Sequence, residues 1–342
     1  MKVIKVDHMS KVYSGGIKAV TDLSFDLDEG IIFGFLGPNG AGKSTTIKVL
    51  ATLTDITSGH AKILGVDVSS HPARVRELIG YVPQDISSDG GLTGYENLLL
   101  CAKLHDIPSR LRKARIREIL DLMELTPRAN HLVSTYSGGM VRRLEIGQAM
   151  LHKPRLLFLD EPTIGLDPSG RKLVWEHIRK LNKDSHVTIF LTTHYMEEAD
   201  TLCSKVGIIN RGRLSVIGTP GELKEKVGLG TITTVLDLSK VGDVVKEKDR
   251  TKYLSKLMGP LVASVRLRDG KYDLLVKDAP NNAPGILQKL MDSGITVSHI
   301  EVKNPTLEDA FMKFTGASLS DDGSKGEWHS MRGRRRTFRR LA

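Results

Sequence analysis

The most informative stretch of this chain is Gly37-Pro38-Asn39-Gly40-Ala41-Gly42-Lys43-Ser44-Thr45. It follows a short apolar run, Ile31–Leu36, which reads as a buried strand, and it opens a predicted helix over residues 43–53. Glycines let backbone N–H groups wrap closely around a polyphosphate, where a Cβ would stand in the way. The lysine can neutralise the β- and γ-phosphates, and the Ser44 hydroxyl can ligate Mg²⁺. The stretch therefore predicts a phosphate-binding loop.

A second apolar run ends in two acids. Residues 155–161 read RLLFLDE, so Asp160 and Glu161 stand at the end of a predicted buried strand. An acid at that edge can hold Mg²⁺ through water, and a second acid can orient or deprotonate an attacking water. Acids also end many parallel strands for solubility alone. The pair gains its meaning from the phosphate-binding loop earlier in the chain.

A third motif, Ser137-Gly138-Gly139, opens a predicted amphipathic helix over residues 141–151. Backbone N–H groups and the helix dipole at such a start can bind an anion. The same residues can also form a plain N-cap at Ser137 with a flexible entry. The motif alone leaves both interpretations open.

Composition limits the class of protein. A chain of 342 residues with 40% hydrophobic and 26% charged residues fits two globular domains and a tail. No apolar run approaches the ~18 residues that a membrane-spanning helix needs, and charges near the N-terminus argue against a signal peptide. Cys101 and Cys203 predict two reduced cytosolic thiols rather than a disulfide framework. Seven basic and three acidic residues make 317–342 a basic tail, which we expect to be disordered.

Strands and helices alternate along residues 1–225, which predicts a largely parallel sheet covered on both faces. The expected strands cover residues 3–27 (around a turn at 14–16), 31–36, 155–160, 187–192, 206–210 and 214–218. The expected helices cover residues 43–53, 94–124 (interrupted at Pro108), 141–151, 171–182, 195–203 and 222–227.

The pattern restarts beyond residue 225. Its expected elements are a strand over 231–238, a helix over 243–258, a hairpin of 261–268 and 271–277, a helix over 283–293 and a strand over 295–302. This order is typical of a ferredoxin-like split unit, and a last helix is expected over 306–314. We therefore divide the chain into domains at 1–225 and 226–316, followed by the tail 317–342.

The motifs in their order resemble the ATP-binding subunit of an ABC transporter over about residues 3–220. Besides the three motifs above, the resemblance rests on residues 80–84 (GYVPQ), 165–167 (GLD) and 193–194 (TH). It implies an α/β fold: a P-loop NTPase of the ABC type with a helical subdomain, followed by a small α+β ferredoxin-like C-terminal domain.

A finer resemblance is to the daunorubicin-resistance type of export ATPase. Residues 136–146 (YSGGMVRRLEI), 193–200 (THYMEEAD) and 305–311 (PTLEDAF) carry it, which extends the resemblance to about residue 316. The common family signature has glutamine where this chain has Met140, which cannot make the glutamine's polar contacts. Since the serine and both glycines are retained, we expect hydrolysis to survive.

The resemblance implies ATP and Mg²⁺ as cofactors and assigns roles to individual residues. Tyr13 would stack on adenine, His194 would contact the γ-phosphate, and Asp167 would lie across a dimer interface. The implied catalytic residues are Lys43, Gln84, Glu161 and His194, and the implied metal-site residues are Ser44, Gln84 and Asp160. The implied nucleotide-binding residues are Tyr13, Gly37, Pro38, Asn39, Gly40, Ala41, Gly42, Lys43, Ser44, Thr45, Gln84, Ser137, Gly138 and Gly139.

The resemblance also implies partners. A second ABC subunit, most simply another copy of this chain, would contribute Ser137–Gly139 to the nucleotide held by the first. A separate integral-membrane permease would dock on the Gln84 loop and the helical region up to Glu124. The subunit would then be cytoplasmic, peripheral on the inner face of the cell membrane. Arg332–Arg340 is either a solvated end or a contact with anionic lipid.

The leading interpretation is an ATPase that powers an exporter whose cargo the permease chooses. The alternative is a soluble ABC-type ATPase acting on nucleic acid or the ribosome through the arginine tail. The single nucleotide domain and the lack of heptads or cysteine clusters disfavour it, so no specific nucleic acid is expected. A regulatory ATP binder without catalysis is disfavoured by Glu161 and His194.

Overall fold

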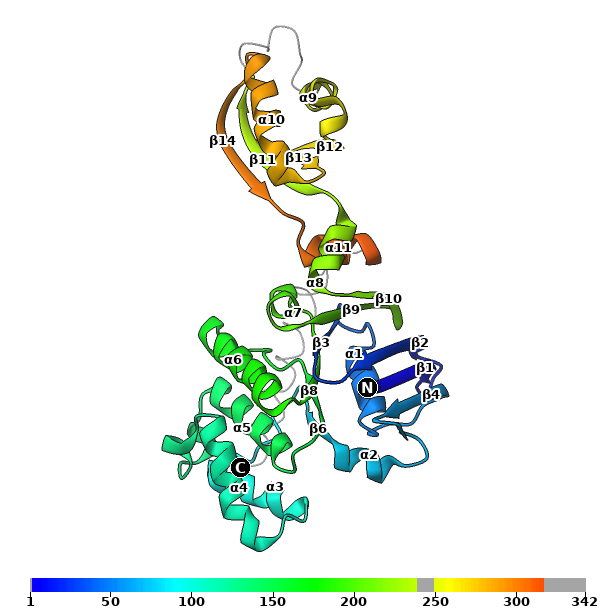
Figure 1. Cartoon of the computed structure of the whole chain (residues 1–342), viewed down its shortest axis with the longest axis vertical. Helices are drawn as coiled ribbons and strands as arrows, with labels where there is room; N and C mark the ends of the chain where they lie inside the picture. Colours follow the sequence, from blue (N-terminus) through cyan, green and yellow to red (C-terminus); the bar gives the residue numbers. More distant parts are fainter. Residues whose placement is uncertain (1, 239–248, 317–342) are drawn as a thin grey trace, which may run out of the picture. The chain divides into compact units, whose positions relative to one another are not determined.

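The computed structural model describes residues 2–238 and 249–316. These residues divide into two compact units, of which the first ends at Pro220 and the second covers Gly221–Gly316 (Figure 1). The predicted tail 317–342 and the first part of the helix expected over 243–258 lie outside the described residues.

A six-stranded sheet forms the centre of the first unit, in the order β10-β9-β3-β8-β7-β6. Neighbouring strands from β9 to β6 run parallel, and only the β9–β10 hairpin is antiparallel. Every residue of β3, β7 and β8 is buried, as expected for parallel strands covered on both faces. The strands are β3 (Ile32–Leu36), β6 (Ile79–Val82), β7 (Leu156–Asp160), β8 (Thr188–Thr193), β9 (Lys205–Asn210) and β10 (Arg213–Gly218).

A second, antiparallel sheet lies beside the first, in the order β2-β1-β4-β5. Helix α1 packs between the two sheets, since it contacts β2 and β4 on one side and β7 on the other (Figure 1). A cluster of buried apolar side chains, including Phe25, Phe33 and Phe190, fills this layer. The elements are β1 (Lys2–Val12), β2 (Lys18–Asp28), β4 (Ser58–Ile63), β5 (Val66–Asp67), α1 (Lys43–Leu50) and α2 (Pro72–Leu78).

The other helices of the first unit are α3 (Gly94–Leu104), α4 (Ser109–Leu122), α5 (Gly138–Met150), α6 (Pro168–Ser185) and α7 (Met196–Leu202). Helices α3, α4 and α5 pack on one another as a helical part of the unit, and α5 also packs on β6 and α6. Thr93 and Glu96 form a capping box at the start of α3, and the predicted break at Pro108 separates α3 from α4. Short 3-10 turns cover Thr126–Arg128 and Val133–Thr135.

The second unit has a four-stranded antiparallel sheet in the order β12-β13-β11-β14. With the chain order β11-α9-β12-β13-α10-β14, this is the predicted ferredoxin-like arrangement. Its core is a separate apolar cluster that includes Ile232, Leu274 and Leu290. The elements are α8 (Pro220–Val227), β11 (Gly230–Asp237), α9 (Arg250–Met258), a 3-10 turn (Gly259–Leu261), β12 (Ser264–Arg268), β13 (Lys271–Val276), α10 (Ala279–Asp292), β14 (Thr296–Lys303) and α11 (Leu307–Thr315).

Several expectations about element boundaries were wrong: among others, α5 begins at Gly138 rather than at residue 141, and β12 begins at Ser264 rather than at residue 261. Helix α10 begins at Ala279 rather than at residue 283, although Pro284 lies inside it. Its buried residues Ala279, Ala283, Ile286 and Leu290 recur at helical spacing, so packing outweighs the local cost of proline. Helix α1 ends at Leu50, short of 53, and α6 begins at Pro168, before residue 171.

Candidate active site

The loop 37–45 joins β3 to α1, at the edge where the central parallel strands end. A Cβ added to Gly37 would lie 2.5 Å from the Ile209 carbonyl oxygen, and one at Gly42 would lie 2.4 Å from the Ala19 oxygen. Gly42 also has a φ of 102°, which side-chain-bearing residues rarely adopt. These contacts require glycine at both positions. The first N–H groups of a helix such as α1 have no partner within the helix and can bind a phosphate.

Lys43 is buried and its ammonium group is held by three oxygens. Nζ donates to the carbonyl oxygens of Gly37 (2.8 Å) and Pro38 (3.1 Å) and lies 3.2 Å from Oε1 of Glu161. The Lys43 side chain therefore folds back over its own loop, and the carboxylate of Glu161, which follows β7, balances its charge.

Asp160 lies at the centre of a small hydroxyl cluster. Its Oδ1 accepts from Ser44 Oγ at 3.0 Å and from Thr192 Oγ1 at 2.6 Å. Asp160 and Thr192 are register partners in the parallel pair β7–β8, which brings the ends of both strands to the same edge as the loop. Two of the three predicted metal-site residues, Ser44 and Asp160, are thus in direct contact. Oxygen groups of this kind are the ligands that Mg²⁺ prefers.

Glu161 follows Asp160 with a left-handed φ of 48°, a strained conformation for a residue with a side chain. Its N–H donates to Thr192, and its Oε2 lies 3.0 Å from Nδ1 of His194. Burial alone raises the pKa of this carboxyl, but the hydrogen bond from His194 and the charge of Lys43 outweigh it, so the pKa is lowered. The carboxylate can only accept, so the proton of His194 sits on Nδ1.

The structure thus brings together five predicted site residues: Lys43, Ser44, Asp160, Glu161 and His194. It does so because the loop after β3, the end of β7 and the end of β8 meet at one edge. The cluster joins a lysine that can hold phosphate to an ionised acid with a hydrogen-bonded histidine. This is a set of groups that can bind a nucleoside triphosphate and activate water against it.

Other predicted residues lie apart from this cluster. Tyr13 is on the turn after β1, partly exposed, with Lys11 Nζ 5.1 Å from its ring centre. The Gln84 side chain is exposed beyond β6. Ser137 is exposed as the N-cap of α5, where its Oγ accepts from the N–H of Met140 at 3.3 Å. In the part of the chain that the structure describes, none of the three hydrogen-bonds to residues 37–45.

Sequence reasoning gave Thr192 and Glu198 no role. Thr192 links Asp160 to the backbone of Glu161. Glu198 on α7 is fully buried and accepts from Thr163 Oγ1 (2.8 Å) and Trp175 Nε1 (2.9 Å), which ties the segment after β7 to α6. Two features of the sequence could have pointed to these residues. Thr192 is a polar residue at the end of an apolar strand, and Glu198 is an acid on the buried face of a helix.

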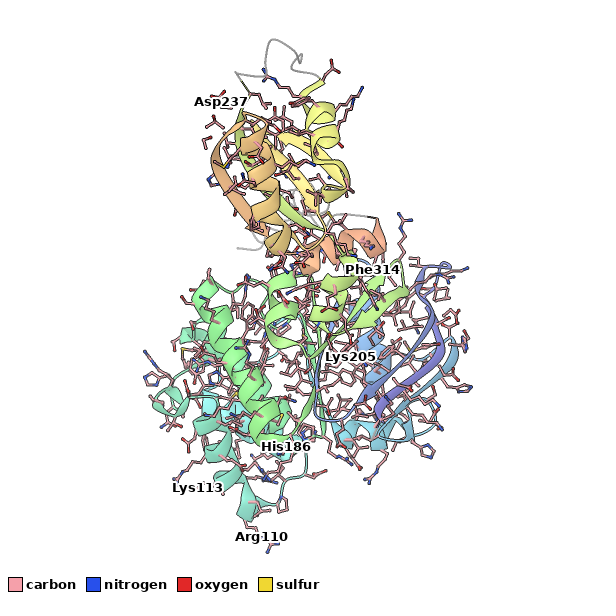
Figure 2. All side chains as sticks on the ribbon, turned by 45° about the horizontal axis from the view of Figure 1, so that its top comes forward. Arg110, Lys113, His186, Lys205, Asp237 and Phe314 are labelled. Atoms are coloured by element: carbon pink, nitrogen blue, oxygen red, sulfur yellow. The ribbon has the colours of Figure 1, made fainter. Side chains whose placement is uncertain are left out.

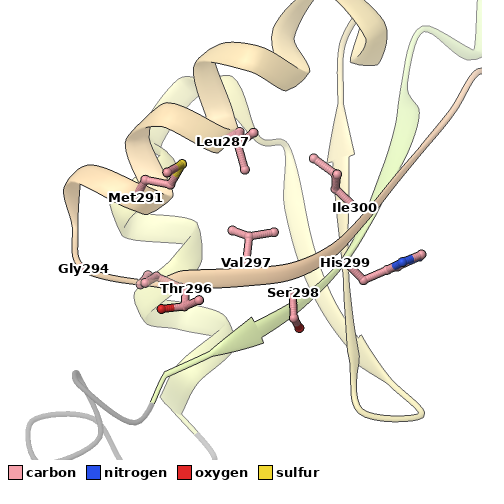
Figure 3. A pocket seen from close by; sticks show the side chains of 9 residues that line it. Leu287, Met291, Gly294, Thr296, Val297, Ser298, His299 and Ile300 are labelled. Atoms are coloured by element: carbon pink, nitrogen blue, oxygen red, sulfur yellow. The ribbon is translucent and has the colours of Figure 1, made fainter.

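Among residues 221–238 and 249–316, the second unit shows no comparable cluster of charged side chains. A groove between α10 and β14 is lined by nine residues, among them Leu287, Met291, Val297 and Ile300 (Figure 3). None of the nine is lysine or arginine, so the groove lacks the cations that a phosphate requires.

Comparison with known proteins bears directly on this site. The ABC transporter family matches residues 20–164, and the C-terminal domain family of DrrA1-3-like ATP-binding proteins matches residues 218–315. The linearmycin resistance ATP-binding protein LnrL of Bacillus subtilis is 35% identical and covers 93% of this chain and 100% of its own. The daunorubicin/doxorubicin resistance ATP-binding protein DrrA of Streptomyces peucetius is 37% identical, covering 94% of each chain.

The chain belongs to the ATP-binding subunits of ABC transporters. It is the ATPase subunit of an ABC exporter, and it resembles the daunorubicin-resistance type of export ATPase. Nothing in the comparisons favours the alternative of a nucleic-acid or ribosome ATPase.

Solved structures agree with the fold of this ABC subunit. CbiO1 of Clostridium perfringens, described as part of an ABC transporter complex, has a TM-score of 0.61 at 26% identity and covers 66% of this chain and 93% of its own. An ATP-binding cassette described as a dimer bound to ADP and Pi has a TM-score of 0.58 at 25% identity, with 63% and 98% covered. Among residues 2–238 and 249–316, no helix has the length and apolarity to cross a membrane.

Proposed function

We propose that this subunit hydrolyses Mg-ATP in a composite site formed by two copies of the chain. Residues 37–45 of one copy would hold the phosphates, and Ser137–Gly139 of the other would close over them. The observation that carries the proposal is the contact of one carboxylate, Glu161, with both Lys43 and His194. A lysine for phosphate and an ionised base for water then stand side by side.

The exposed position of Ser137–Gly139 supports the role of the second copy. These residues open α5, a 13-residue helix whose N-terminus carries a partial positive charge. Ser137 and Gly138 are exposed and Gly139 is half-buried, and among the described residues none of the three hydrogen-bonds to the loop 37–45 of its own chain. Their anion-binding groups thus suit a nucleotide presented from outside, and the related cassette bound to ADP and Pi is described as a dimer. Asp167, the N-cap of α6, would lie at the same interface.

The cluster around Asp160 fits Mg²⁺. Ser44 Oγ and Asp160 Oδ1 are hard oxygen donors already in contact, and Gln84 would complete the set when its loop approaches. The ion supplies charge neutralisation of the phosphates when bound. Thr192 holds the orientation of Asp160 through its own hydroxyl.

The remaining roles follow from the contacts of Glu161. As an ionised acid it would accept the proton of the attacking water or orient that water. His194 would keep the carboxylate oriented through Nδ1–H, and its contact with the γ-phosphate would require a second proton on Nε2, because phosphate oxygens only accept. When nucleotide binds, the ammonium group of Lys43 would leave Glu161 and the loop carbonyls and would contact the β- and γ-phosphates instead. Tyr13, partly exposed after β1, would stack on adenine.

We further propose that a separate integral-membrane permease docks on the Gln84 loop and the helical part of the first unit. Large apolar side chains are exposed there at Ile86, Leu100 and Leu104, which suits a protein partner. Arg110 and Lys113 extend outward from α4 nearby (Figure 2). The subunit would thereby sit on the inner face of the cell membrane. A lipid contact through Arg332–Arg340 concerns residues outside the described ranges.

The test is ATPase activity of the purified full chain beside its Glu161→Gln variant, with the oligomeric state read by light scattering. We expect wild type to hydrolyse Mg-ATP, and the variant to lose about 100-fold or more in rate and to form an ATP-held dimer. Glu197→Gln, a change at an exposed acid outside the cluster, is the matched control. Equal hydrolysis by wild type and Glu161→Gln, or no binding of nucleotide by either, would refute the proposal.

A further inference from the structure

Helix α5 contains a buried ion pair that the mechanism above does not use. Arg142 and Glu145, one turn apart, are nearly fully buried, with Nη1 and Oε2 3.0 Å apart. Burying two charges costs free energy that their attraction often fails to repay. The other hydrogen bonds of Arg142 and Glu145 explain why this buried pair is present.

Both side chains reach across to the loop that carries Gln84. Arg142 donates from Nη1 to the carbonyl oxygen of Pro83 (2.7 Å) and from Nη2 to that of Gln84 (2.9 Å). Oε1 of Glu145 accepts from the N–H of Ser87 at 2.5 Å and from its hydroxyl at 3.0 Å. The ion pair therefore holds both ends of segment 83–87.

A third residue of the same helix extends this contact. Gln148, a further turn along α5, accepts from the Ser88 hydroxyl at 3.0 Å. Positions 142, 145 and 148 lie on one face of the helix, because residues three apart are neighbours there. We call this face and segment 83–88 the polar clamp. The Gln84 side chain remains exposed, while its carbonyl oxygen accepts from Arg142.

We propose that Arg142 and Glu145 are positioning residues that hold Gln84 at a fixed place relative to Ser137–Gly139. Helix α5 begins with those signature residues, so nucleotide contact at its N-terminus and the place of Gln84 are linked through one rigid element. This inference rests on the proposed function, in which Gln84 serves the Mg²⁺ and water network and the permease interface.

The chain offers a matched control for the arginine. Arg143 is the next residue of α5 and is equally buried, but its Nη1 donates to the carbonyl oxygen of Met123 (2.8 Å), away from segment 83–88. Lysine cannot reproduce the planar fork that serves two carbonyls at once. Arg142→Lys therefore opens the clamp, while Arg143→Lys makes the same chemical change outside it.

The experiment measures kcat and KM for ATP together with hydrogen exchange at the Ser87 amide, in the full chain. We expect Arg142→Lys and Glu145→Gln to lower kcat by about tenfold or more, because Gln84 loses its position. We expect KM to change little, because residues 37–45 are untouched. Exchange at Ser87 should accelerate by about tenfold in Arg142→Lys. Arg143→Lys should stay near wild type in all three measurements.

Two results would overturn the inference: a kcat in both clamp variants equal to that of Arg143→Lys, or unchanged exchange at Ser87. If Arg142→Lys fails to fold by circular dichroism, Glu145→Gln supplies the same test. If wild type itself does not hydrolyse ATP, the proposed function fails. Exchange at Ser87 still tests the clamp in that case, so the two failures are distinguishable.

Discussion

Lys43 Nζ lies 3.2 Å from Oε1 of Glu161, and the two side chains are only 4% and 6% exposed. The proposed phosphate-binding lysine and the proposed catalytic base thus form one buried ion pair. Removing one member of such a pair leaves the other charged and unpaired, which is strongly unfavourable. In the proposed mechanism, nucleotide binding therefore competes with Glu161 for the charge of Lys43.

This competition predicts that Glu161→Gln binds ATP several-fold more tightly than wild type, since an unpaired Lys43 gains more from the phosphates. Isothermal titration calorimetry at fixed Mg²⁺ measures the affinity. Glu29→Gln, which removes a surface acid paired with Arg155, should leave the affinity unchanged. Equal or weaker binding by Glu161→Gln would show that the ion pair does not oppose the nucleotide.

A second prediction concerns pH. Burial raises the pKa of Glu161, and the hydrogen bond from His194 with the charge of Lys43 brings it below its ordinary value. In His194→Ala this hydrogen bond is lost, so the pKa rises and the base stays protonated to higher pH. The variant should therefore show two effects: a lower plateau of kcat/KM, and an acidic limb of the pH profile that lies at higher pH than in wild type. An unshifted acidic limb with only a lower plateau would contradict this.

A third prediction concerns Glu198. Burial raises the pKa of its carboxyl, although hydrogen bonds from Thr163 and Trp175 act in the opposite direction. The folded state holds this proton more tightly than the unfolded state. Its contribution to stability is complete below the ordinary value of 4.5 and is lost as pH rises toward the folded pKa.

Glu198→Gln keeps an acceptor and carries no charge, so its thermal midpoint should fall less than that of wild type between pH 5 and pH 8. Differential scanning fluorimetry across this range measures the slope. Glu197→Gln, the exposed neighbour, should keep the wild-type slope. Parallel slopes for wild type and Glu198→Gln would mean that the buried acid is not coupled to folding.

Much of the fold could be predicted because its signals are local. Ile32–Leu36 and Leu156–Asp160 are continuous apolar runs, and such runs indicate parallel strands buried on both faces. The elements between residues 58 and 82 were not predicted. Ser58–Ile63 buries only two of its six residues, so its pattern is weak, and β6 is a four-residue strand at the end of the sheet.

The site divides in the same way. Ser44, Asp160 and Glu161 stand next to predicted strands and loops, and the parallel topology brings them to one edge. The partners of Arg142 and Glu145 could not be predicted. Their spacing marks them only as a helical ion pair, and what they hold depends on the loop that packs across α5.

A fourth prediction tests the core that supports this edge. Phe190 on β8 is fully buried, with ring centres of Phe33, Phe35 and Phe158 at 5.1, 5.6 and 5.5 Å. Phe190→Ala should cost about 3–5 kcal/mol of unfolding free energy in the first unit, because lost contacts and a cavity add together. Ile17→Ala, at an exposed position, should cost less than about 0.5 kcal/mol by the same denaturant titration. A small loss for Phe190→Ala would mean that the aromatic cluster is not what holds the sheet.

The central claim is that two copies of the chain share each site, and mixing two inactive variants tests it most directly. Lys43→Ala removes the phosphate contact but leaves Ser137–Gly139 intact. Ser137→Arg blocks the signature residues but leaves Lys43 intact. In a homodimer their mixture contains heterodimers with one complete site, so about a quarter of wild-type ATPase activity should return. A mixture as inactive as each variant alone would contradict the shared site.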